Sequence, residues 1–128
     1  KASALDRVNV RRLLIELKSY ISQVALNLVF EQNSIATRNS FLALKVSFFN
    51  QIHDLCKELG VNYNAVAHYT GMDPRITESH TKITEARGFG GHCFPKDTSA
   101  LTTTAQRNNV ELSILEQAIS YNKKIRKD

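Results

Sequence analysis

The sequence predicts an all-α protein built around one long central helix. Apolar residues recur at helical spacing along much of the chain, and no stretch alternates between apolar and polar residues with the period of two that strands show. Apolar residues make up 42% of the 128 residues and charged residues 23%, as in folded globular proteins rather than disordered ones. This length is enough for one domain with a modest core.

The first predicted helix runs from about residue 10 to residue 30. Asn9 is one candidate for its N-cap and Ser3 is the competitor, since both side chains can accept a bond from a backbone N–H group. The polar segment 31–34 breaks or bends this helix. The helix is predicted from apolar positions three or four residues apart, namely Val10, Leu13, Leu14, Leu17, Ile21, Val24 and Leu28.

The second predicted helix spans residues 40–59 and carries two adjacent apolar stripes, which leave only a narrow polar face. Such a helix has to be buried on most sides, as the central post of the fold or of a dimer. We therefore expect a homodimer, and we expect the first helix either to pack along this central helix or to replace contacts that a further domain would make. One stripe contains Phe41, Leu44, Phe48, Ile52, Leu55 and Leu59, and the other contains Leu42, Val46, Phe49, His53 and Cys56.

The remaining elements are shorter. Gly60 ends the central helix as a C-cap, Asn62 caps a helix that Gly71 closes, and residues 72–87 form a loop with one irregular turn.

Two further helices follow the loop. Pro95 fits the first position of a helix that reaches about residue 106. Asn108 or Asn109 then caps a last helix, which carries apolar residues from 114 to 125.

Charge, apolar run length and cysteine content limit the partners and the cellular compartment that we expect. The formal charge is +5, and no nucleic-acid recognition module is visible, so we do not expect nucleic acid as a partner. The longest apolar run, residues 24–30, is too short to span a bilayer, so we expect no membrane association. Cys56 and Cys93 fall on different elements without a disulfide framework, which favours the reducing cytoplasm of a bacterium or of a phage-infected host.

The most specific motif is Arg87-Gly-Phe-Gly-Gly-His-Cys-Phe-Pro-Lys-Asp97. Cys93 lies at a predicted helix start, where unpaired N–H groups favour an anion, and Lys96 adds positive charge nearby. The glycines Gly88, Gly90 and Gly91 allow unusual dihedral angles or close approach of a ligand. The competing interpretation of the thiol is a small buried hydrophobic group.

This motif resembles the catalytic cysteine loop of the UDP-glucose/GDP-mannose dehydrogenase family. The resemblance implies that Cys93 attacks an aldehyde intermediate, that a hydride leaves to NAD, and that Asp97 orients the water that hydrolyses the thioester. It also implies that the substrate sugar contacts the loop around it, through Gly88, Phe89, Gly90, Gly91 and Lys96.

Three further segments extend the resemblance over residues 37–128. Residues 39–50 resemble the family's central helix, with Asn39 at the position that hydrogen-bonds the oxyanion. Residues 71–76, Gly-Met-Asp-Pro-Arg-Ile, resemble a segment whose arginine, here Arg75, reaches the sugar in the partner subunit's site. Residues 121–128 resemble the end of the family's central domain, and in the family these domains pair into dimers that bind a nucleotide sugar.

The pattern also departs from the family in two places. The family has a lysine one helical turn before the position of Asn39, and Ile35 stands there instead. No Gly-x-Gly-x-x-Gly follows a predicted strand, so we expect no NAD site in these 128 residues. We expect the chain alone to be a catalytically incomplete relative of the family, with no oxidation activity of its own.

The N-terminal segment has a different resemblance. Ser3-Ala-Leu-Asp-Arg-Val-Asn-Val-Arg-Arg-Leu13, followed by residues 30–38 and Phe41, resembles the C-terminal domain of contractile phage tail sheath proteins. The two resemblances meet at residues 37–42. They imply a chimera of a sheath-like segment, 1–36, and a dehydrogenase-like domain, 37–128, which arose by recombination or by construction.

Other interpretations stay open. The chain is alternatively a protein-binding module that acts through exposed apolar surface, or a remnant without selected activity. His53 and Cys56 have a spacing that metal ligands use, but their place on the apolar stripe favours a core role, so no metal is expected. His68 and His80 are read as isolated surface or loop residues, and Phe41, Phe48 and Phe49 as core or dimer interface.

Overall fold

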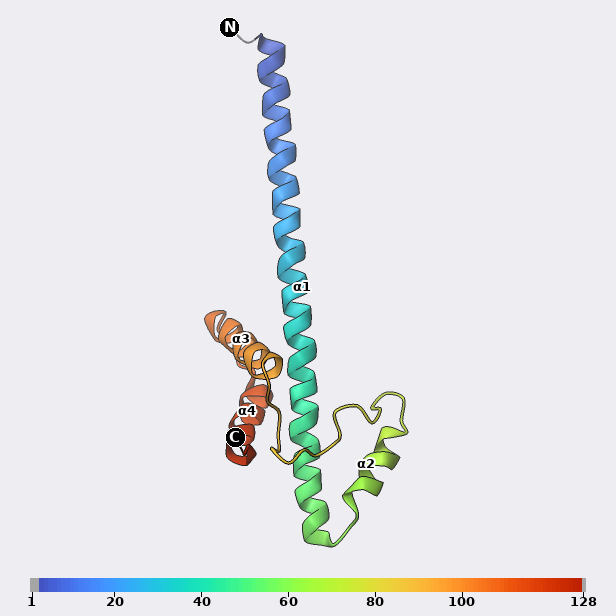
Figure 1. Ribbon diagram of the computed structural model, residues 1–128. Coiled ribbons are helices and arrows are strands. Elements are labelled where there is room, and N and C mark those ends of the chain that lie inside the picture. The colour runs from blue at the N-terminus through green and yellow to red at the C-terminus, as the bar shows by residue number, and fades with distance from the viewer. Residues whose placement is uncertain (1–2, 128) are drawn as a thin grey trace. The chain divides into compact units, whose positions relative to one another are not determined.

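The computed structural model describes residues 3–127, and within them it contains helices and loops but no strand. The helices follow in the order α1 (Ala4–Leu59), α2 (Tyr63–Gly71), α3 (Cys93–Arg107) and α4 (Ser113–Ile125), as labelled in Figure 1. The all-α prediction is therefore confirmed. Residues 1, 2 and 128, which the predicted domains included, lie outside the described residues.

The chain divides into two units, Lys1–Ser34 and Ile35–Asp128, which are described separately below. The division falls two residues before the start of the dehydrogenase-like domain expected from the sequence. Whether the first unit derives from a tail sheath stays a prediction.

The first two predicted helices are one helix, so of the two alternatives for residues 31–34, a break or a bend, the break was wrong. That segment contains neither glycine nor proline, and glutamate and glutamine are good helix formers, so polarity alone does not end a helix there. The helix also begins earlier than Asn9. The backbone N–H of Asp6 donates to Ser3 Oγ at 3.1 Å, and the Ser3 N–H donates to Asp6 Oδ2 at 2.9 Å, which makes Ser3 the capping residue.

The first unit is a helix without a buried face. Every side chain that the structure describes within residues 3–34 is exposed, including those of its apolar residues. By length and composition alone, the helical stretch Asp6–Leu59 is apolar enough to cross a membrane, with a window of mean hydropathy 1.3. The run of residues 24–30 thus understates the apolar length of this helix, while the expectation of no membrane association stays a prediction. A soluble core helix or a signal sequence passes the same test, so the finding does not assign a membrane.

The second unit packs its other elements around residues 35–59 of α1. In Figure 1, α3 and α4 lie on one side of this stretch, α2 lies on the other, and the long loop between α2 and α3 crosses it. The buried apolar residues are Ala43, Phe49, Cys56, Ala67, Phe89 and Leu115.

One of the two stripes on this stretch is covered and the other is not. Phe49 and Cys56 are buried, whereas Phe41, Phe48, Leu55 and Leu59 are 53–66% exposed. The prediction that the helix is buried on most sides therefore does not hold within one chain. The three short helices α2, α3 and α4 and the loop supply too little surface to cover both stripes.

The predicted boundaries around α2 hold in part. Gly60 has a φ of 65°, and the Val61 N–H donates to the Cys56 carbonyl at 2.9 Å, so the predicted glycine cap is confirmed. Asn62 Oδ1 accepts from the Ala65 N–H at 3.2 Å, as expected of an N-cap. Gly71, in contrast, is the last helical residue rather than a cap.

The starts of α3 and α4 differ from prediction. α3 begins at Cys93, so Pro95 is its third residue rather than its first. Asn108 is the C-cap of α3, and Asn109 follows with a φ of 57°. α4 starts only at Ser113, after Leu112. Asparagine is common at both helix ends because it tolerates left-handed backbone, so the sequence did not distinguish an end from a beginning.

Candidate functional site

Polar side chains from α1 hold the start of the glycine loop. Arg87, at a φ of 61°, donates from Nε to Asn50 Oδ1 at 2.8 Å and from Nη2 to both carboxylate oxygens of Asp54 at 2.8 Å. The Gly88 N–H also donates to Asn50 Oδ1, at 3.2 Å. Asn50 is 1% exposed whereas the Asp54 side chain is 46% exposed, so these bonds extend from the interior to the surface. The hydrogen bonds from Arg87 lower the pKa of Asp54, against the opposing effect of partial burial.

Asn122 on α4 holds the next residue of the loop. The Phe89 N–H donates to Asn122 Oδ1 at 2.7 Å, and Asn122 Nδ2 donates to the Phe89 carbonyl at 2.9 Å. A Cβ at Gly88 would lie 2.1 Å from Asn122 Oδ1, and Gly88 has a φ of 55°. Only glycine fits there.

The predicted substrate-binding backbone is therefore largely engaged by the chain itself. Both backbone groups of Phe89 bond to Asn122, and a Cβ at Gly90 would lie 2.2 Å from the Arg126 guanidinium. Gly91 differs, because a Cβ there would meet nothing within 4 Å while its φ is 78°. We conclude that Gly88 serves the packing of the loop, that Gly90 faces only the flexible end of the Arg126 side chain, and that open space lies beside Gly91.

The three predicted catalytic residues lie at the junction of α3 with α1. Cys93 is exposed at the first turn of α3, and Asp97 follows four residues later, so both side chains lie on one face of the helix. Asn39 Nδ2 donates to Asp97 Oδ2 at 2.6 Å, across 58 residues of sequence. The thiol is thus not the buried hydrophobic group of the competing interpretation.

The Asp97 carboxylate is held in its charged form. Asp97 is 7% exposed, and its pKa is lowered first by the hydrogen bond from Asn39, opposed by burial, and then by the charge of Lys96. Lys96 Nζ lies 3.4 Å from Asp97 Oδ1 and is itself exposed. A negative oxygen next to an exposed thiol can orient a water molecule or accept a proton.

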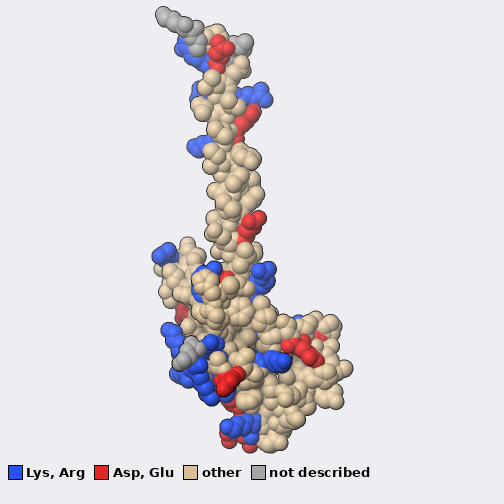
Figure 2. All heavy atoms as spheres, viewed as in Figure 1, with Lys and Arg blue, Asp and Glu red and all other residues tan. Residues whose placement is uncertain are grey.

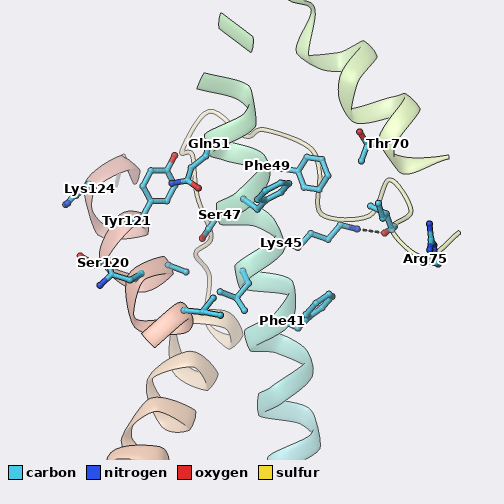
Figure 3. A pocket seen from close by; sticks show the side chains of 16 residues that line it. Phe41, Lys45, Ser47, Phe49, Gln51, Thr70, Arg75, Ser120, Tyr121 and Lys124 are labelled. Carbon is cyan, nitrogen blue, oxygen red and sulfur yellow. Dashed lines mark hydrogen bonds between the residues drawn. The ribbon is translucent and has the colours of Figure 1, made fainter. Parts of the chain in front are cut away.

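Arg75 lies apart from this cluster. It is paired with Asp73 through a 2.6 Å bond from Nη2, and it lines an apolar groove of about 720 Å³ on the second unit, shown in Figure 3. Lys45 also lines the groove and donates to the carbonyls of Ile76 and Thr77. The chain thus does not bring Arg75 to Cys93, and its predicted role in a partner's site stays a prediction.

The histidines have structural contacts. His53 bonds to Asp54 at 3.1 Å and meets the Tyr63 ring edge-on at 5.1 Å. His68 is not isolated as expected, because its Nδ1 lies 2.5 Å from Glu78 Oε1.

His80 likewise has neighbours, contrary to expectation. Its ring lies 5.7 Å from that of Phe94, and its Nδ1 lies 2.6 Å from Ser79 Oγ. Among residues 3–127, no group of three or more side chains of the metal-binding types comes together.

Sequence reasoning missed the residues that hold the glycine loop: Asn50, Asp54, Arg87 in its supporting role, and Asn122. Asn50 interrupts an apolar helix face, and Arg87 opens the motif. Both features could have indicated from the sequence that these residues hold the loop. A buried asparagine in an otherwise apolar surface has to find hydrogen-bond partners, and loop backbone is the usual one.

The second unit is thus an all-helical domain that presents an exposed thiol at a helix start beside an amide–carboxylate pair. The family model of the UDP-glucose/GDP-mannose dehydrogenase family, central domain, matches residues 35–124. The chain belongs to this family. The match begins at Ile35, so the resemblance of residues 1–36 to a tail sheath stays a prediction.

Individual relatives agree with this assignment. The UDP-glucose 6-dehydrogenase of Rhizobium meliloti (strain 1021) is 42% identical over 84 residues, which are 66% of this chain and 19% of that protein. UDP-glucose 6-dehydrogenase TuaD of Bacillus subtilis (strain 168) is 41% identical over 88 residues, 69% of this chain and 19% of that protein.

A solved UDP-glucose dehydrogenase from the hyperthermophilic archaeon Pyrobaculum islandicum superposes with a TM-score of 0.63 at 37% identity, over 70% of this chain and 20% of that one. The chain spans about a fifth of the length of these relatives.

Proposed function

We propose that residues 35–128 are the thiol-bearing central domain of a nucleotide-sugar dehydrogenase, in which Cys93 forms a covalent adduct with a sugar aldehyde. The observation that carries this proposal is the 2.6 Å bond between Asn39 and Asp97, one helical turn from the exposed thiol. An amide that can donate to a carbonyl oxygen and a carboxylate that can accept a proton are groups that assist addition of a nucleophile to a carbonyl.

The adduct forms in one balanced step. The Cys93 thiolate adds to the carbonyl carbon, an S–C bond forms as the C=O π bond breaks, and the oxygen takes up a proton. The second hydrogen of Asn39 Nδ2 is available to the oxygen that becomes negative.

NAD does not fit the residues of this chain. The sequence contains no Gly-x-Gly-x-x-Gly motif, and residues 3–127 contain no strand from which a dinucleotide-binding unit could be built. We therefore expect these 128 residues alone to be catalytically incomplete. Ile35 in place of a lysine points the same way, since loss of one oxyanion donor typically costs about 10²–10³ in rate.

Protection of the thiol tests the adduct. A nucleoside diphosphate hexose with an aldehyde at C6 should reversibly protect Cys93 from iodoacetamide, whereas the corresponding alcohol should not. Asp97→Asn keeps the size of the side chain but removes its charge, and it should weaken protection. Equal alkylation with and without the aldehyde contradicts the proposal. UDP-glucose with NAD should yield no NADH from this chain, and steady NADH production contradicts the incomplete assignment.

We also propose that the second unit forms a homodimer through the groove of Figure 3. Phe41 and Phe48 are 65% and 56% exposed, and both line the groove on the uncovered stripe of α1. Ser47 also lines it, with a buried Oγ that has no hydrogen-bond partner within the described residues. Apolar surface of this kind is more often an interface than free surface.

Sedimentation of two matched variants tests the dimer. Phe48→Asp places a charge in the groove, whereas Leu55→Asp places one at a residue equally exposed, at 53%, but outside it. We expect the first variant to shift the second unit toward monomer and the second variant to leave the association unchanged. Equal effects, or a wild-type chain that shows no association through this face at micromolar concentration, contradict the proposal.

A further inference from the structure

Exposed apolar residues occur on several sides of the helix in the first unit, and some of them form a regular seam along one side. Six of them are spaced alternately four and three residues apart, and each is 40–59% exposed. We call this row the heptad seam: Val10, Leu14, Leu17, Ile21, Val24 and Leu28. An average spacing of 3.5 residues keeps the seam facing a second helix that winds around the first. Binding of the helix to a flat apolar surface would not require this spacing.

We propose that the heptad seam pairs with the same seam of a second copy, as a parallel, in-register, two-stranded coiled coil. This surface is separate from the groove of the second unit, because the two share no residue. The proposal therefore does not depend on the dehydrogenase function or on the dimer proposed above.

A hollow in the surface supports this kind of partner. It has a volume of about 360 Å³ and is lined by Asp6, Arg7, Val10, Arg11 and Leu14. In heptad terms, Arg7, Val10, Arg11 and Leu14 are the four residues that surround an inserted side chain of a parallel partner. The hollow thus has the position of a socket for the partner's Val10.

Charges beside the seam select the parallel orientation. In a parallel pair, Asp6 of each copy lies opposite Arg11 of the other, which brings opposite charges together twice. In an antiparallel pair aligned on the same seam, Lys18 would lie opposite the second copy's Lys18, which is repulsive.

The charged residues outside the seam indicate that a second helix, rather than a lipid bilayer, covers the seam. Arg12 and Glu16 form an ion pair at 3.0 Å, and neither residue belongs to the seam. In a hydrocarbon core, Glu16 and Lys18 would each be costly. In a coiled coil both stay in water, while the uncharged surface visible along this segment in Figure 2 is partly covered.

Disulfide formation in the 128-residue chain tests the proposal. In a Cys93→Ser background, Val24→Cys places a thiol in the seam, and Leu26→Cys places one on the opposite side of the same helix. Both replace exposed apolar side chains, at 40% and 51% exposure. In a glutathione redox buffer, Val24→Cys should form covalent dimers at least about tenfold faster, because pairing holds the two thiols at roughly millimolar effective concentration.

Three results would overturn the proposal. The first is equal cross-linking of the two variants. The second is faster cross-linking between Leu14→Cys and Val24→Cys chains when they are mixed, which reports an antiparallel pair. The third is flotation with phosphatidylcholine–phosphatidylglycerol vesicles without seam cross-linking, which reports a lipid surface. Ile21→Asp should abolish cross-linking at residue 24, while Phe48→Asp should leave it intact. The coiled coil and the groove dimer therefore succeed or fail separately.

Discussion

Replacing Asn122 with alanine should destabilise the second unit more than a typical single substitution does. The change removes the bonds of 2.7 Å and 2.9 Å to the backbone N–H and carbonyl of Phe89, which is 5% exposed. A buried polar group left without a partner costs about 1–3 kcal/mol, so two of them cost about 2–4 kcal/mol once some water enters. A domain of this size loses about 4–8 °C per kcal/mol, so the melting temperature should fall by roughly 10–30 °C.

The Cys56 thiol is a reporter for this measurement, because it is buried in the second unit. In a Cys93→Ser background, labelling of Cys56 during urea titration follows the unfolding of that unit and is insensitive to the exposed first unit. The slope of the free energy of unfolding against urea concentration should stay unchanged. A lower urea midpoint then reports lower stability.

Asn108→Ala is the matched control. Its side chain donates one exposed bond of 2.8 Å to the Thr104 carbonyl, and its loss should cost no more than about 0.5 kcal/mol. If Asn122→Ala lowers the free energy of unfolding as little as Asn108→Ala does, the reasoning is refuted, because the loop then does not depend on the bonds between Asn122 and Phe89.

Further consequences can be measured on the same protein. Cys93 should react with iodoacetamide at least about 10²-fold faster than Cys56, which becomes accessible only when the domain opens, and similar rates in peptide mass spectra would contradict the placement of the thiols. The pKa of Asp97, followed by NMR, should lie below 3.8 and should rise toward that value in Asn39→Ala. Because the folded pKa is the lower one, the stability that this carboxylate contributes is present above pH 3.8 and is lost as pH falls through the folded pKa. The stability difference between wild type and Asn39→Ala should therefore shrink in acid, and a difference independent of pH would refute the assignment. Arg87→Met should lower the free energy of unfolding by about 2 kcal/mol, less than for a fully buried pair because the carboxylate partner is 46% exposed, and a urea midpoint like that of wild type would contradict this.

Local patterns predicted much of the fold. Helical spacing, Gly60 and Asn62 marked the end of α1 and the start of α2, because a cap involves neighbours three or four residues away. The same kind of reasoning failed at residues 31–34, where polarity was taken for a helix break. A helix needs only the absence of breakers to continue, whereas burial depends on what packs against it.

The sequence by itself determined the chemistry of the site: a thiol at a helix start, followed one turn later by a carboxylate, in a motif specific enough to identify the family. Only the tertiary structure decided what holds the site, namely Asn39 against Asp97, Asn50 and Asp54 against Arg87, and Asn122 against Phe89. These partners are 33–58 residues apart in the chain. Spacing along a sequence carries no information about such pairs, since it is the packing of α3, α4 and the loop against α1 that brings them within hydrogen-bonding distance.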